Sequence, residues 1–126
     1  MDHAADKRLL AQVPRGEEDM DVFELSEVIA ARQQAGDEYL QFLNAGSLSV
    51  GLYVLAAGSV DSQKPHAEDE VYYVVSGRAT LRVGEEDRPV SAGSIAFVGA
   101  NVEHRFHAID EALTLLVFFA PEHKGG

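Results

Sequence analysis

The chain has 126 residues, 46% of them hydrophobic, which is enough to form the core of a single domain. Its 21 acidic and 10 basic residues give a net charge of −11, which argues against nucleic acid or an anionic membrane surface as a partner. Because the chain contains no cysteine, thiol catalysis, thiolate metal sites and disulfides are excluded.

The first 20 residues are mixed in charge, contain Pro14 and Gly16, and show little periodicity. We interpret them as an N-terminal arm, followed by one domain over residues 21–126. The first ten residues lack the apolar segment of a signal peptide. No apolar stretch in the chain approaches the ~18 residues of a membrane-spanning helix. We therefore expect a soluble protein of the cytoplasm.

Residues 26–35 predict a short helix, with Ser26 as its N-cap, Glu27 in the first turn and Gly36 as its stop. After Gly36 the pattern changes to short apolar or alternating stretches that are separated by turn residues. Such a series, with no helices between the strands, predicts an all-β antiparallel sandwich or barrel. The predicted strands are 39–43, 48–55, 71–75, 79–83, 94–98 and 113–119.

The chain has five histidines, and they are the first candidates for chemistry. His3 and His123 lie near the two ends, where we expect them to be solvated. His107 follows His104 by three residues, a spacing that places the two on opposite faces of a strand. We expect His107 at the surface or behind the site, which leaves His66 and His104 as candidate ligands.

Two spaced patterns surround these histidines. The first consists of Gly58, Lys64, His66, Glu70 and Gly77. It resembles the first signature of the cupin family, G-x5-H-x-H-x3/4-E-x6-G, in every spacing, but Lys64 stands in place of the first histidine.

The second pattern consists of Gly93, Gly99, Asn101, His104 and Ala108. It is similar to the second cupin signature, G-x5-P-x-G-x2-H-x3-N, and keeps its first glycine and its histidine. Gly99 and Asn101 tolerate the backbone angles of a tight turn, so the loop that presents the histidine can survive both substitutions.

The resemblance implies a small jelly-roll cupin with a divalent transition metal, Fe, Mn, Ni or Zn, held by His66, Glu70 and His104. A lysine ammonium has no lone pair, so Lys64 cannot act as a ligand at neutral pH. Two alternatives follow. In one, Lys64 stands at the rim of a metal site, where it can pair with an anionic substrate. In the other, the metal is lost and Lys64 neutralises Glu70 or Glu68 inside a pocket that only binds a ligand.

Three neighbours are further candidates for the pocket. Glu68 and Asp69 are expected to be solvated turn residues, although Glu68 is a reserve ligand because it can share a face with His66. Tyr72 is expected either to line the pocket or to pack in the core, and Phe106 to form an apolar wall beside His104.

The resemblance leaves two classes of function open. One is a metal-dependent enzyme, of the oxygenase or isomerase type, that acts on a small organic molecule, including an anionic one. The other is a non-catalytic ligand-binding or sensing cupin with a degenerate metal site. Because the run 115–119 supplies two apolar faces, more than one sandwich core requires, we also expect a homodimer.

Overall fold

The computed structural model describes residues 20–123, so the predicted arm lies outside the described residues except for Met20. The described chain is mostly antiparallel β-sheet with one short helix, which confirms the predicted fold class. The elements are α2 (Leu25–Ala35), β1 (Tyr39–Asn44), β2 (Ser49–Leu55), β3 (Asp69–Val83), β4 (Glu86–Ser91), β5 (Ile95–Val98) and β6 (His104–Ala120).

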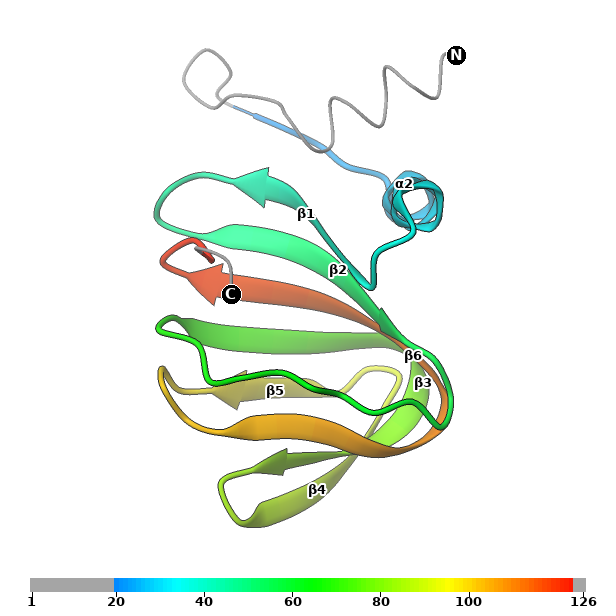
Figure 1. The fold of residues 1–126 in the computed structure, drawn as a ribbon. Coiled ribbons are helices and arrows are strands. Elements are labelled where there is room, and N and C mark those ends of the chain that lie inside the picture. The colour runs from blue at the N-terminus through cyan, green and yellow to red at the C-terminus, as the bar shows by residue number, and fades with distance from the viewer. Residues whose placement is uncertain (1–19, 124–126) are drawn as a thin grey trace.

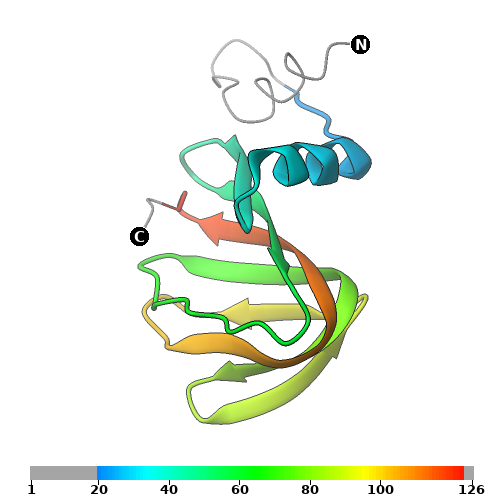
Figure 2. The ribbon, with the colours of Figure 1, turned by 45° about the vertical axis from the view of Figure 1, so that its right-hand side comes forward.

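The strands follow the order β1-β2-β6-β3-β4, and β5 pairs with β3. The long strands β3 and β6 pair with each other over nearly their whole length. The first part of β3 also pairs with β5 and the last part with β4. Both long strands bend strongly, so the sheet curls around an interior (Figures 1 and 2).

The strand β3 joins two predicted strands, 71–75 and 79–83, into one element. The bend between them lies at Gly77, which has a φ of 99°, and the pairing with β6 shifts register on both sides of it. A Cβ atom at Gly77 would collide with the backbone of Ala112 and Leu113 in β6. Only glycine combines this φ with so close an approach of two strands.

The predicted helix is present, but Ser26 is not its N-cap. The N-cap is Glu24, and its side chain makes no capping hydrogen bond. Gly36 ends the helix in the left-handed conformation, as expected. In both views α2 lies beside β1 and β2 (Figures 1 and 2). Among the described residues, no helix has the length and apolarity needed to cross a bilayer.

Two strand predictions need correction. The strand β4 is absent from the predicted strands, because Glu86, Asp87 and Arg88 are polar and Pro89 lacks an N–H group. Five of its six side chains are exposed, so only Val90 carries a hydrophobic signal. The strand β6 begins at His104 rather than at residue 113, because a positive φ of 48° at Ala108 breaks its alternation without ending the strand.

Two hydrophobic clusters hold the fold together. The larger one fills the curled sheet and includes Tyr72 and Phe106, each 1% exposed. The smaller one joins Val28 and Ala31 of α2 to Leu52 of β2. The interior cluster leaves room at one end, and the candidate site lies there.

Candidate functional site

A long loop, residues 56–68, crosses the open side of the curled sheet between β2 and β3 (Figure 1). Asp61 anchors it and is only 4% exposed. Its Oδ2 accepts the backbone N–H of Phe106 at 2.8 Å, which ties the loop to β6. Its Oδ1 accepts the hydroxyl of Tyr53 at 2.9 Å. The loop is therefore held in place by a buried carboxylate.

Asp61 also positions Gln63, whose side-chain amide donates to Oδ2 at 2.8 Å. With the amide nitrogen committed to Asp61, the amide oxygen points at two other groups. It accepts the hydroxyl of Tyr72 at 3.1 Å and lies 3.2 Å from Nε2 of His66. Gln63 thus links the anchor of the loop to the candidate ligand His66.

The three predicted ligands come together in the folded chain. His66, Glu70 and His104 each offer a ligand atom, and these atoms all lie within 4.8 Å of one another. Glu70 and His104 are buried, with side chains 1% exposed, whereas His66 is half-buried. Burial lowers the pKa of His66 below its usual value, although Glu70 opposes the shift. The ring is therefore neutral near pH 7, as ligation requires.

The contact between His104 and Glu70 has the character of a cation site. Nδ1 of His104 lies 2.8 Å from the carbonyl of Val102, which can only accept, so Nδ1 carries the proton. In the neutral ring Nε2 is then an acceptor, and it lies 2.8 Å from Oε1 of Glu70. The contact is short and buried, and among the described residues Oε2 of Glu70 has no hydrogen-bond partner. Two acceptors so close together need a positive charge between them, which either a second proton on the ring or a bound metal ion supplies.

A divalent ion fits this arrangement. Two ligand atoms about 2.1 Å from one ion lie about 3 Å apart around an octahedral ion and about 3.4 Å apart around a tetrahedral one. The 2.8 Å between His104 and Glu70 is closer to the octahedral spacing. Burial on its own lowers the pKa of His104, but the Glu70 carboxylate and the Val102 carbonyl outweigh it and raise that pKa. Both neighbours therefore favour positive charge at this position.

A cavity of about 170 Å³ opens beside the ligands. Aromatic side chains form most of its wall, together with Gln63 and Val117. The hydroxyl of Tyr39 is buried there, and none of the residues 20–123 gives it a hydrogen-bond partner. Burial, reinforced by the charge of Glu70, raises the pKa values of Tyr39 and Tyr72, so both phenols stay protonated. The lining residues are Tyr39, Tyr53, Gln63, His66, Tyr72, Val117, Phe119 and His123.

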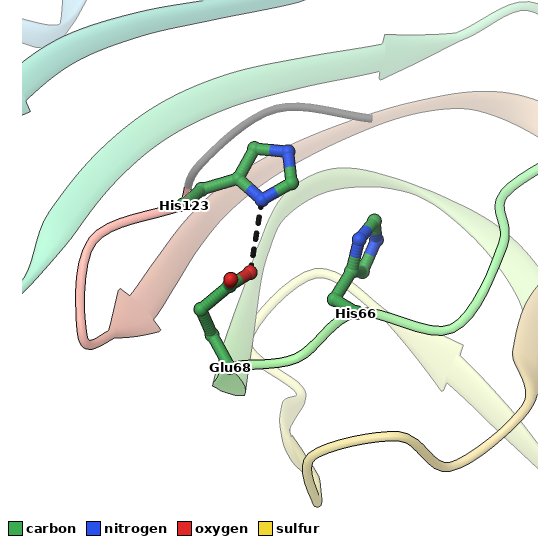
Figure 3. Close-up of side chains that lie close together, drawn as sticks. All are labelled: His66, Glu68 and His123. Atoms are coloured by element: carbon green, nitrogen blue, oxygen red, sulfur yellow. Dashed lines mark hydrogen bonds and ion pairs between the residues drawn. The ribbon is translucent and has the colours of Figure 1, made fainter.

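Two residues that were expected to be solvated belong to the site. Glu68 is 6% exposed, and its Oε1 lies 3.0 Å from Nδ1 of His123 (Figure 3). With His66 they form a second group whose ligand atoms lie within 4.8 Å of one another. The expectation failed because His123 follows the last strand, yet the end of β6 returns the chain to the mouth of the cavity. Asp69 is exposed, as expected.

The remaining candidates fall into three places. Lys64 is exposed and does not line the cavity, whereas Glu70 and Glu68 face His104 and His123. Tyr72 is both a core residue and a cavity residue. Phe106 is core, packed edge-to-face on Tyr72 with ring centres 4.9 Å apart, and is not a cavity wall. His107 lies on the outer side, paired with Asp87, as its spacing predicted.

Sequence reasoning missed Asp61, Gln63 and His123. The first two occupy variable positions inside the first motif, where spacing carries no information. A weak signal existed, since an aspartate and a glutamine precede Lys64 in a segment with few other polar anchors. His123 had no local signal, because only the register of β6 brings it to the site.

Comparison with known proteins gives consistent matches. A family model described as a cupin domain matches residues 51–119. The uncharacterized protein SCO3923 of Streptomyces coelicolor is 54% identical over 102 residues, 81% of this chain and 97% of that protein. The structure of TT1209 from Thermus thermophilus is 28% identical, covers 82% of this chain and 99% of its own, and has a TM-score of 0.64.

A cupin-2 domain, Rru_A2000 of Rhodospirillum rubrum, is 19% identical with a TM-score of 0.61. The match covers 69% of this chain and 61% of that one, so this chain spans less than two thirds of its length. The range 51–119 contains His66, Glu70 and His104 but ends before His123.

Proposed function

Because the chain belongs to the cupin domain family, we propose that it binds a divalent transition metal and acts on a small organic molecule in the adjacent cavity. The ligands are His66, Glu70 and His104, and Fe, Mn, Ni and Zn all suit two histidines and one carboxylate. The observation that carries this proposal is the convergence of these three residues, whose ligand atoms all lie within 4.8 Å of one another around the buried 2.8 Å contact between His104 and Glu70.

When bound, the ion supplies a Lewis acid or an oxygen-activating centre, which suits isomerase- or oxygenase-type chemistry. The protein supplies the surroundings. The aromatic wall buries the surface of a small apolar substrate away from solvent. The protonated phenols of Tyr39 and Tyr72 can donate hydrogen bonds to it. The Tyr39 hydroxyl, which has no partner within the described part of the chain, is the donor best suited to orient a substrate oxygen, whether neutral or anionic.

The alternative, a ligand-binding cupin without a metal, depends on a pair between Lys64 and a carboxylate in the pocket. Lys64 is exposed, and the two buried carboxylates contact histidines instead. These contacts favour the metal-binding proposal.

The test is elemental mass spectrometry on untagged protein after gel filtration. We expect about one transition-metal ion per chain in the wild type. His104→Ala and Glu70→Gln should each lower the affinity at least ~100-fold, because each removes a direct ligand where losing an outer partner already costs 10–100-fold. His107→Ala is the matched control and should retain the ion. Equal metal contents in the wild type and in His104→Ala would contradict the proposal.

Turnover is tested on the metal-loaded protein with a panel of small phenols and organic acids, analysed by liquid chromatography and mass spectrometry. Product that forms in the wild type but not in Glu70→Gln supports an enzyme. A compound that binds with metal-independent affinity and is recovered unchanged supports the ligand-binding alternative.

The proposal includes a homodimer and a location in the cytoplasm. The absence of cysteine agrees with the cytoplasm, because disulfides are rare in that reducing compartment. The outer face of β3, β5 and β6 supports self-association, because Tyr73, Ile95, Phe97 and Phe118 are exposed there in neighbouring register. Ile95 is 73% and Phe97 65% exposed, which is unusual for large apolar side chains on a sheet.

We expect Phe97→Glu to convert the dimer to a monomer, because the substitution places a charge in the centre of this apolar face. Sedimentation equilibrium measures the mass. The control is Val60→Glu, a change at an 81% exposed apolar residue in the loop 56–68. A monomeric wild type, or dissociation by both variants alike, would refute this assignment of the interface.

A further inference from the structure

We propose that Glu68 and His123, together with His66, form a second position for a divalent ion at the mouth of the cavity, beside the position formed by His66, Glu70 and His104. We call the group of His66, Glu68 and His123 the outer position and the group of His66, Glu70 and His104 the inner position. This inference rests on the proposed metal-binding function through one shared ligand, His66. The other two ligands of the outer position, Glu68 and His123, do not belong to the inner one.

The spacing of the outer position is close to that of the inner one. Nδ1 of His123 lies 3.0 Å from Oε1 of Glu68, close to the separation of about 3 Å for neighbouring ligands of an octahedral ion. Figure 3 shows these two side chains directed toward each other, with the His66 ring beside them. The rings of His66 and His123 are 4.9 Å apart, and those of His66 and His104 are 5.5 Å apart. His66 therefore lies between the other two imidazoles.

The ring of His123 is fixed by contacts that do not depend on Glu68. It stacks on Phe119, with ring centres 4.4 Å apart and an 18° angle between planes. Its backbone N–H donates to Oγ of Ser49, a fully buried residue, at 2.9 Å. Tyr39 also packs edge-on against the ring. A ligand held in this way loses little conformational entropy when an ion binds.

The outer position should be the weaker of the two. The side chain of His123 is 15% exposed and that of Glu68 is 7% exposed, whereas Glu70 and His104 are each 1% exposed. The contact between His123 and Glu68 also has the geometry of a hydrogen bond, which an ion must replace. Because His66 belongs to both groups, an ion at the inner position leaves the outer one with two ligands. The site thus offers one ion two alternative positions.

The Glu70→Gln/His104→Ala double variant isolates the outer position. Titration of the full-length, untagged protein with Zn²⁺ by calorimetry should give about one ion per chain, with an affinity at least ~100-fold below that of the wild type. Adding His123→Ala should reduce this remaining affinity at least tenfold further. Adding Glu68→Gln should do the same, because a neutral amide is a poor zinc ligand. Adding His107→Ala should change nothing.

Circular dichroism of each variant confirms that it is folded. Glu68→Gln keeps an acceptor for His123, so it tests the position even where His123→Ala loosens the end of the chain. The proposal is overturned if the double variant binds no Zn²⁺, or if its binding is unchanged by both His123→Ala and Glu68→Gln. The hydrogen bond would then serve only to hold residues 121–123. Failure of the inner position gives a different result, namely equal Zn²⁺ affinity in the double variant and the wild type.

Discussion

Gly77→Ala is expected to lower the free energy of unfolding by about 3 kcal/mol. Two costs add up in this substitution. Alanine is strained at a φ of 99°, and its Cβ would meet the carbonyl of Ala112 and the backbone of Leu113. That backbone cannot withdraw without weakening the pairing of β3 with β6. Urea denaturation monitored by circular dichroism measures the loss.

Gly93→Ala separates the two costs. Gly93 has a φ of 94°, close to that of Gly77, but a Cβ atom there would have no heavy atom within 4 Å, apart from its chain neighbours. Only the backbone strain remains, so we expect a loss of about 1 kcal/mol. Similar losses in the two variants would mean that the close approach of β3 and β6 contributes nothing at Gly77.

Asp61→Ala is expected to lower the free energy of unfolding by about 3 kcal/mol and to weaken metal binding about tenfold. The substitution leaves the buried N–H of Phe106 and the hydroxyl of Tyr53 without their acceptor. It also releases the Gln63 amide, which lies against His66. Urea denaturation gives the stability, and Zn²⁺ titration at a temperature where the variant is folded gives the affinity.

Asp87→Ala is the matched control for Asp61→Ala. Asp87 also contacts several partners, His107 and Arg82 among them, but it lies on the surface of the sheet. Exposed pairs contribute little, so neither stability nor metal affinity should change appreciably. If Asp61→Ala changed neither the stability nor the metal affinity, the loop 56–68 would be held by its other contacts. The role given to the buried carboxylate would then be wrong.

Strands that alternate or are wholly apolar could be predicted from the sequence, because burial on one or both faces determines their residue types. The stretch 48–55 and the run 113–119 both match strands of the structure, apart from residue 48. The strand β4 could not be predicted, because its partner β3 supplies its hydrogen bonds while most of its side chains face solvent. The continuity of β3 through Gly77 is also a tertiary property, set by β6.

The candidate ligands His66, Glu70 and His104 could be predicted because the fold fixes their spacing along the chain. The same reasoning gave the turn at Asn101, whose φ of 64° is one that asparagine tolerates. Gly99, by contrast, has no positive φ. His123 and Asp61 could not be found in this way, since their neighbours in space, Glu68 and Phe106, are 55 and 45 residues away in sequence.

The position of β6 between β2 and β3 has a consequence for synthesis on the ribosome. Both neighbouring strands are made long before β6, as Ser49 pairs with Phe119 and Val71 with Phe118. Until residues 104–120 leave the exit tunnel, β2 and β3 each expose an unpaired strand edge. Such edges can form incorrect β-pairings with other chains, which leads to aggregation. The hairpin of β3 and β4 can form early. The sheet becomes continuous from β1 to β4 only when β6 arrives, and the proposed outer position, through His123, is completed after it.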